Sequence, residues 1–204
     1  MLGCWLKKET NSNFLPLFLT SFLKKWLLSL LKNISIEAKN SKESLTVLTD
    51  LVLPGETNYL DNLFGGELLA RMDRACSIAA RRHSRRIVVT ASVNHVAFNK
   101  SVPVGSVVTI EAKVSRAFNS SMEIYVDVWI EDRQSRSRTK VNEGIYTFVA
   151  VDETGKPVAI PQIIPETVLE KERFEGALRR KQLSLVLAGK LAPSKATALK
   201  ALFN

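Results

Sequence analysis

The fold is decided by the segment Asn58-Tyr-Leu-Asp-Asn-Leu-Phe-Gly-Gly-Glu-Leu-Leu-Ala-Arg-Met-Asp73. A polar turn leads into Gly65 and Gly66, which open a helix that we expect over residues 65–82. Apolar residues recur at helical spacing on one face of this helix, and Asp73 lies among them. The members of that face are Leu69, Met72, Cys76, Ile78, Ala79 and Ala80.

A carboxylate on an apolar face loses water on folding, which is unfavourable without a partner. The amides of Gly65 and Gly66 lie at the positive end of the helix dipole, where they can hold an oxyanion. Together these features predict an acyl-transfer site. The structural alternatives are an ion pair of Asp73 with Arg74 or an interface arginine, and close helix–strand packing at the glycines.

The net charge of +9 is unevenly distributed along the 204 residues. Residues 1–42 carry seven basic and two acidic groups, residues 43–168 fourteen and fifteen, and residues 169–204 eight and three. A neutral middle argues against a core devoted to nucleic acid. The two cysteines, Cys4 and Cys76, make no disulfide framework and indicate a reducing compartment, here the cytoplasm.

Three regions are expected: an N-terminal extension over residues 1–42, a central domain over 43–165 and a basic helical tail over 166–204. Residues 14–31 are apolar, but Lys24-Lys25 interrupts them, and the unbroken run is about half of the ~20 residues that a bilayer span needs. This stretch is a membrane-surface helix, a helix that packs against a partner, or an extension that the fold does not need. In the tail, residues 169–188 are expected to form a helix that Gly189 ends.

The central domain has five strand-like runs around the helix of residues 65–82. They span residues 45–53, 87–98, 106–118, 122–131 and 141–151, and a charged loop, 132–140, precedes the last of them. Short connections favour antiparallel pairing. The predicted class is therefore α+β, with one long helix wrapped by an antiparallel sheet of about five strands.

This order and its motifs resemble the hotdog-fold acyl-CoA thioesterases, in particular the short-chain bacterial branch related to brain acyl-CoA hydrolase. The resemblance covers residues 44–162. Besides residues 57–73, its motifs are Ile87-Val-Val-Thr-Ala-Ser-Val93 with Phe98, Pro103-Val-Gly-Ser-Val-Val108 and Tyr146-Thr-Phe-Val-Ala-Val-Asp152.

The resemblance implies hydrolysis of acyl-CoA at a site on a dimer interface. Asp73 would act as general base or nucleophile, Asn58 would position the water or thioester, and the amide of Gly65 or Gly66 would polarise the carbonyl. Asn58 and the glycine amide would come from one subunit and Asp73 from the other. The family further implies a homodimer, assembled as a trimer of dimers, and no cofactor besides the coenzyme A of the substrate.

Two positions depart from the family pattern. Phe64, at a substrate-binding position, replaces the histidine of many relatives, and Arg71 replaces a neutral polar residue. A basic rim for the coenzyme A phosphates is expected from Arg82, Arg85, Arg86, Lys100 and Arg116.

Two other functions remain open, an acyl-thioester dehydratase and a non-catalytic acyl-CoA-binding protein. A dehydratase of this family needs a catalytic histidine on or near the helix, and none stands at the matching place. Neither His83 nor His95 is spaced to pair with a nucleophilic serine, and no metal-ligand cluster is visible. Cys76 is interpreted as core packing, and Asn58 on its own is typical of a turn.

Overall fold

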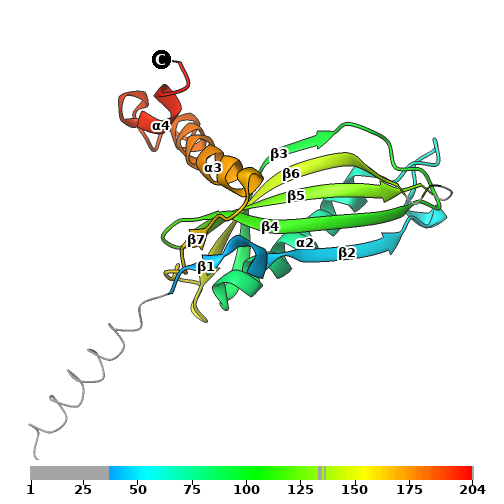
Figure 1. Ribbon diagram of the computed structural model, residues 1–204, viewed down its shortest axis with the longest axis horizontal. Coiled ribbons are helices and arrows are strands. Elements are labelled where there is room, and N and C mark those ends of the chain that lie inside the picture. The colour runs from blue at the N-terminus through cyan, green and yellow to red at the C-terminus, as the bar shows by residue number, and fades with distance from the viewer. Residues whose placement is uncertain (1–36, 133–134, 136, 204) are drawn as a thin grey trace, which may run out of the picture. The chain divides into compact units, whose positions relative to one another are not determined.

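A five-stranded antiparallel sheet wraps around one long helix, α2 (Gly65–Ser84), in this computed structural model (Figure 1). The structure describes residues 37–132, 135 and 137–203. The predictions for residues 14–31 therefore lie outside the described residues. Among those described, no helix has both the length and the apolar character needed to cross a membrane.

The five strands of the sheet match the predicted runs with small shifts at their ends. They are β2 (Thr46–Leu51), β3 (Ile87–Phe98), β4 (Val107–Ala117), β5 (Ser121–Glu131) and β6 (Arg138–Val151). β6 begins inside the predicted loop of residues 132–140, because Arg138 and Lys140 pair across to β5. The helix also continues two residues beyond the predicted end, to Ser84.

The strand order in the sheet is β2-β4-β5-β6-β3. Consecutive strands pair as expected from β4 through β6, but β3 does not pair with β4, which follows it in the chain. It pairs instead with β6, in a register that slips between Thr90 and Ser92 and again between Val93 and His95. β3 is therefore an edge strand, and its second row of backbone groups has no partner strand among the described residues.

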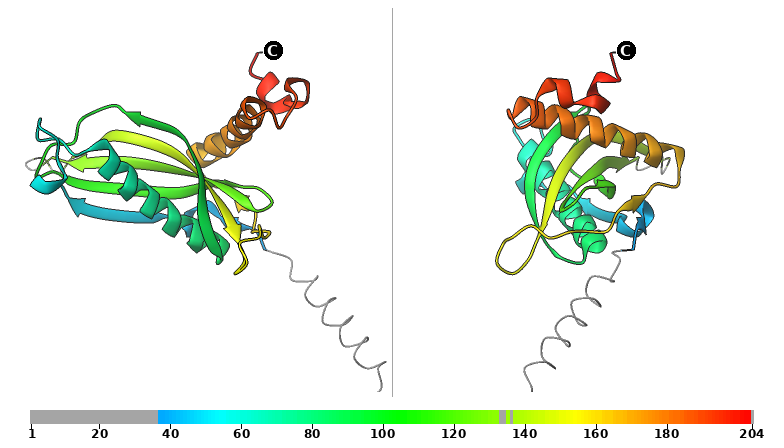
Figure 2. Two further views of the ribbon diagram at one scale, coloured as in Figure 1. Left: turned by 180° about the vertical axis from the view of Figure 1, so that it is seen from behind. Right: turned by 90° about the vertical axis from the view of Figure 1, so that its left-hand side faces the viewer.

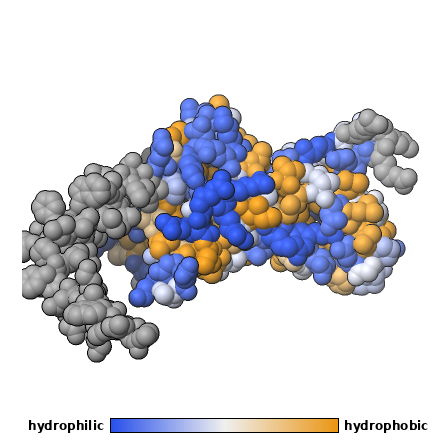
Figure 3. Space-filling model, turned by 90° about the horizontal axis from the view of Figure 1, so that it is seen from below, coloured by the Kyte–Doolittle hydropathy of each residue, from blue (hydrophilic) through white to orange (hydrophobic). Residues whose placement is uncertain are grey.

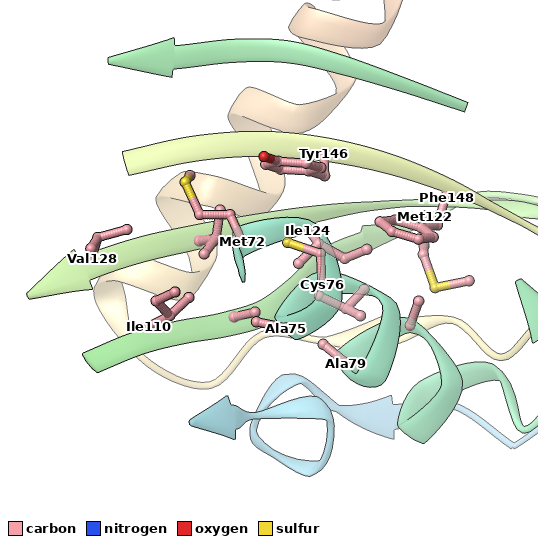
Figure 4. Close-up of a cluster of buried hydrophobic side chains, with 14 of the residues drawn as sticks. Met72, Ala75, Cys76, Ala79, Ile110, Met122, Ile124, Val128, Tyr146 and Phe148 are labelled. Carbon is pink, nitrogen blue, oxygen red and sulfur yellow. The ribbon is translucent and has the colours of Figure 1, made fainter. Parts of the chain in front are cut away.

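The core lies between α2 and the inner face of the sheet (Figure 4). Its helical side differs from the predicted face at two positions. Leu69 is half-buried and Ile78 is 37% exposed, whereas Leu68 is buried. The residues that pack in Figure 4 are Met72, Ala75, Cys76 and Ala79 from α2 against Ile110, Met122, Ile124, Val128, Tyr146 and Phe148 from the sheet.

Gly144 lets α2 lie close to β6. A Cβ atom at this position would be 2.6 Å from the Met72 Cε and 3.3 Å from the His95 carbonyl oxygen. Both distances are shorter than normal carbon contacts, so a side chain would force the helix or Met72 to shift.

The opposite, outer face of the sheet is covered in part by α3 (Val168–Leu187), which confirms the predicted C-terminal helix (Figure 2). Ion pairs join the two layers. Arg180 donates to both carboxylate oxygens of Glu123 at 2.7 and 2.9 Å, and Arg173 donates to those of Asp127 at 2.9 and 3.1 Å. Part of the basic excess of the tail is thus neutralised by acidic residues of β5.

Short elements complete the described chain. β1 (Lys39–Asn40) and β7 (Ile163–Ile164) form a parallel pair that the sequence analysis did not predict. The other pieces are the 3-10 helices η1 (Ser41–Ser44), η2 (Pro54–Glu56) and η3 (Pro193–Lys195), and helix α4 (Thr197–Lys200). Viewed from the side on which β2 lies, hydrophobic and hydrophilic patches alternate on the surface (Figure 3).

Candidate active site

Asp73 lies in the middle of α2, on the side of the helix that faces β3. Its side chain is half-buried rather than enclosed. The Thr90 hydroxyl, on β3, donates a hydrogen bond of 2.9 Å to the Asp73 Oδ1. The alternative ion pair with Arg74 is not present among the described residues, so the carboxylate keeps an oxygen free for chemistry.

Thr90 was not singled out from the sequence, although it lies in one of the motifs that carry the family resemblance. No spacing rule connects a residue of the helix with one on a strand 17 positions later. The contact arises because the chain reverses at Arg85, which ends α2 in the left-handed region with a φ of 53°. β3 then runs back beside the helix.

Asn58 lies in the loop between η2 and α2, and its side chain stabilises that loop. The Asn58 Oδ1 accepts hydrogen bonds from the amides of Leu60 and Asn62, at 2.9 and 3.3 Å. The predicted turn role is therefore confirmed. Within the described chain the Asn58 Nδ2 donates to no other residue, so one end of the carboxamide builds the turn and the other end is free to donate.

The start of α2 offers unpaired amides. The first hydrogen bond back to the helix start runs from the Leu68 amide to the Phe64 carbonyl, which leaves the preceding amides of Gly65, Gly66 and Glu67 without acceptors inside the helix. Gly66 has open space where a side chain would be, and Gly65 lies against the Phe98 ring. Phe64 is the N-cap residue and is 51% exposed.

Asp73 and the glycine amides of the same chain are too far apart to act on one thioester. They are separated by seven or eight residues of α2, which is about 10–12 Å along the helix axis at 1.5 Å per residue. A general base must lie within about 3 Å of the proton that it removes, or act through one water. The arrangement within one chain therefore separates the two halves of the predicted site.

Arg71 joins α2 to the loop that carries Asn58. Its side chain is 4% exposed, and its Nη2 lies 2.7 Å from both carboxylate oxygens of Glu56. The Glu56 carbonyl accepts a hydrogen bond from the Phe64 amide, just before the helix. Hydrogen bonds from the Leu53 amide and then from Arg71 hold the pKa of Glu56 below its usual value. The departure from the family pattern at Arg71 is thus a structural brace.

An open groove with a volume of about 920 Å³ lies at the C-terminal end of α2. It gathers three of the five predicted phosphate-binding residues, Arg82, Arg85 and Arg86, and adds Arg81. Arg82 is partly used elsewhere, because it donates to the Leu45 carbonyl and the Thr46 hydroxyl. The remaining lining comes from Ile78, Ile87, Val151, Asp152, Glu153 and Thr154.

The other two predicted basic residues lie away from this groove. Lys100 is exposed beyond the end of β3, where its amide donates to the Val141 carbonyl. Arg116 is on the sheet, where its guanidinium stacks on the Phe174 ring of α3 at 4.1 Å and donates to the Phe174 carbonyl. The structure therefore groups the arginines of the α2 end and separates Lys100 and Arg116 from them.

The remaining titratable residues have structural surroundings. Cys76 is fully buried, and burial followed by the charge of Asp73 raises the pKa of its thiol, so core packing is confirmed. His83 is buried at the end of α2 with its Nε2 2.8 Å from the Pro161 carbonyl oxygen. His95 is exposed on β3. In the described part of the chain, no cluster of three or more His, Cys, Asp or Glu could hold a metal ion.

The fold is that of a hotdog thioesterase, and comparison with known proteins agrees. The chain belongs to the thioesterase superfamily, whose family model matches residues 60–136. It is 38% identical to an uncharacterized acyl-CoA thioester hydrolase of Bacillus subtilis, YkhA. The 166 aligned residues cover 78% of this chain and 96% of YkhA. It is 41% identical to mouse acyl-coenzyme A thioesterase 11 over 69% of this chain and 24% of that protein.

Solved structures confirm the predicted fold. A hexameric acyl-CoA thioesterase superposes with a TM-score of 0.72 at 39% identity, over 75% of this chain and 98% of the other. An acyl-CoA hydrolase of Staphylococcus aureus, solved with butyryl coenzyme A and coenzyme A, superposes with a TM-score of 0.72 at 33% identity, over 82% and 99%. Variants of that hydrolase have been solved in which an aspartate, a threonine or an asparagine is replaced by alanine.

Proposed function

We propose that this chain hydrolyses acyl-CoA to a free carboxylic acid and coenzyme A. The observation that carries the proposal is the half-buried Asp73 on α2, oriented by Thr90 and present in a member of the thioesterase superfamily. Asp73 would act as general base toward water or as the nucleophile, while an amide at Gly65 or Gly66 stabilises the oxyanion that forms on the thioester carbonyl.

The spacing of three polar residues supports this assignment. Asn58 and Thr90 lie 15 positions before and 17 positions after Asp73. The asparagine, aspartate and threonine replaced in the Staphylococcus aureus variants have the same order and the same spacing. We therefore add Thr90 to the predicted site, as a residue that positions Asp73.

The active form would be a homodimer in which each site uses two chains, because α2 separates Asp73 from its own glycine amides. The unpaired edge of β3 offers the interface. Along β3, Thr90 lies beside Asp73 of the helix, and Phe98 lies beside Gly65 at the helix start. Antiparallel pairing of two β3 strands around Asn94 would put Thr90 of one chain opposite Phe98 of the partner subunit, so Asp73 would approach the partner's helix start.

Three such dimers would make a hexamer, the state of two similar thioesterases of known structure. In the substrate, the pantetheine arm separates the thioester from the phosphates. The basic residues of the α2 groove, Arg81, Arg85 and Arg86, would bind those phosphates, since their guanidinium groups have no acidic partner in the described chain.

A cytoplasmic location is proposed as well, as relatives from rat and human are named cytosolic hydrolases.

The decisive experiment compares Asp73→Asn with the wild-type protein on a panel of acyl-CoA substrates. Asparagine keeps the shape and still accepts the hydrogen bond from Thr90, so the fold should be retained. We expect kcat to fall by about 10²–10⁴-fold, the usual contribution of a positioned base. Glu175→Gln, an exposed change on α3, is the matched control. Wild-type turnover by Asp73→Asn would overturn the proposal.

A further inference from the structure

A second cavity, of about 150 Å³, lies between α3 and strands β3, β5 and β6. It is on the outer face of the sheet, because Ser92 and Glu123 both lie opposite Thr147 in the strand register, in the row that faces Arg180 of α3. The inner-face residues Ile124 and Phe148 alternate with this row and pack toward α2. The cavity is therefore separated by the sheet from Asp73 of the same chain.

Four of the residues that line this cavity carry a hydroxyl group. They are Ser92 on β3, Ser121 on β5, Thr147 on β6 and Ser184 on α3. The Thr147 hydroxyl already accepts a hydrogen bond of 2.9 Å from the Asn94 carboxamide, so its own proton is free to be donated. Four hydroxyl-bearing residues from four different elements thus line one small volume.

The charge at the cavity is positive. Glu123 contributes a carboxylate, but Arg180 neutralises it with two hydrogen bonds. Lys181 then remains, and it makes no ion pair in the described chain; its Nζ lies 3.6 Å from the centre of the Phe118 ring. The Arg116 guanidinium lies 5.7 Å from the centre of the same ring and makes no ion pair among the described residues, although the charge of Glu123 acts on it. Lys181 is therefore a cation without an acidic partner at the cavity, and Arg116 adds a second positive charge beside it.

A half-buried ammonium with no counter-ion is unfavourable. Loss of water, and then the charge of Arg116, lower the pKa of Lys181. An anion in the cavity would relieve both effects. A tetrahedral oxyanion suits the lining best, because its several oxygens can accept from hydroxyls on different elements while Lys181 supplies the opposite charge.

We propose that this cavity binds a small phosphate-type oxyanion, either inorganic phosphate or the terminal group of a phosphomonoester, through Lys181 and the surrounding hydroxyls. The site would join α3 to β3, β5 and β6, so its occupation would stabilise the packing of the C-terminal helix on the sheet. It lies outside the proposed catalytic site and does not depend on thioester hydrolysis.

The test is thermal unfolding of the full chain in phosphate-free buffer, with sodium phosphate or sodium chloride added at equal ionic strength. With phosphate at ten times its dissociation constant, we expect the wild-type Tm to rise by about 3–5 °C more than with chloride. Lys181→Gln should lose this response while keeping, or slightly raising, the Tm without phosphate, since it removes the repulsion with Arg116. Lys171→Gln, an exposed lysine on the same helix, should respond like the wild type.

A calorimetric titration separates the two sources of the anion. Binding of inorganic phosphate that Lys181→Gln abolishes assigns the site to the free ion. Tighter binding of a small phosphomonoester, glycerol 2-phosphate, than of inorganic phosphate, with the difference lost in Lys181→Gln, assigns it to a phosphomonoester. The proposal is wrong if neither ligand distinguishes the wild type from Lys181→Gln, or if that variant merely lowers the Tm equally in both salts.

Discussion

The Thr90 hydroxyl donates to the Asp73 carboxylate across 2.9 Å, and this bond joins the middle of α2 to the edge strand β3. Because β3 is one of the two edge strands of the sheet, the same contact places the carboxylate beside a surface at which a second chain can pair. Thr90 thereby connects the orientation of the Asp73 side chain to the proposed pairing of two chains along β3.

We expect Thr90→Val to lower kcat on acyl-CoA by about 10-fold or more, since a hydrogen bond to a charged group contributes about 1.5–3 kcal/mol. Valine keeps the β-branched shape but cannot donate to Asp73. Thr90→Ser restores the hydroxyl and should keep most of the activity. Steady-state kinetics of both variants, with circular dichroism to verify folding, checks this. Equal loss in both variants would mean that the methyl group, and not the hydrogen bond, matters.

A site shared between two chains predicts complementation. Asn58→Ala and Asp73→Asn should each be nearly inactive alone. Unfolding and refolding them together forms mixed dimers in half of the population, and one site of each mixed dimer then has wild-type Asn58 and Asp73. Activity should recover to about a quarter of the wild-type value, as two-fold symmetry requires. If both residues of a site came from one chain, no recovery would be seen.

The brace between Arg71 and Glu56 predicts unequal effects of its two truncations. Glu56→Ala leaves an arginine side chain that is 4% exposed without its nearest partner, whereas Arg71→Met leaves a glutamate side chain that is 28% exposed and can rehydrate. We expect Glu56→Ala to reduce the free energy of unfolding more than Arg71→Met does, because it leaves a buried charge without its nearest partner. Urea unfolding measures both. A larger loss for Arg71→Met would show that Arg71 acts mainly through the packing of its stem.

His83 predicts how stability depends on pH. Burial is the main cause that lowers its pKa, although the hydrogen bond to the Pro161 carbonyl opposes the shift. The folded state therefore binds the proton less readily than the unfolded state. Stability should be full above about pH 6.5, the unperturbed value, and should fall as the pH drops from there toward the lowered folded pKa.

The slope of this loss should stay below about 1.4 kcal/mol per pH unit, the limit for one proton. Denaturant unfolding of the wild type between pH 7.5 and 5.5 measures it, in a range where carboxylates have little effect. His83→Gln removes the titrating group and should flatten the dependence. His95→Gln is the control, because that side chain is exposed on β3. If the free energy of unfolding of His83→Gln depended on pH as steeply as that of the wild type, another group would be responsible.

The local features of the site followed from the sequence because they depend on neighbours along the chain. The glycine-opened helix, the turn at Asn58 and the strand runs all have short-range periodicity or turn chemistry. The predicted helix face was wrong at Leu69 and Ile78, since a repeating pattern does not reveal how far a sheet curls around a helix. The pairing of β3 with β6 was not predicted either, because it joins segments that are distant in the chain.

Sequence alone determined the class of the fold, the family and the candidate carboxylate at Asp73. The tertiary structure decided which groups surround that carboxylate. Thr90 meets Asp73 only because the chain reverses at Arg85, Arg71 meets Glu56 across the helix start, and Lys181 meets the hydroxyls of three strands only when α3 packs on the sheet. These contacts depend on long-range packing, and no residue spacing along the chain encodes them.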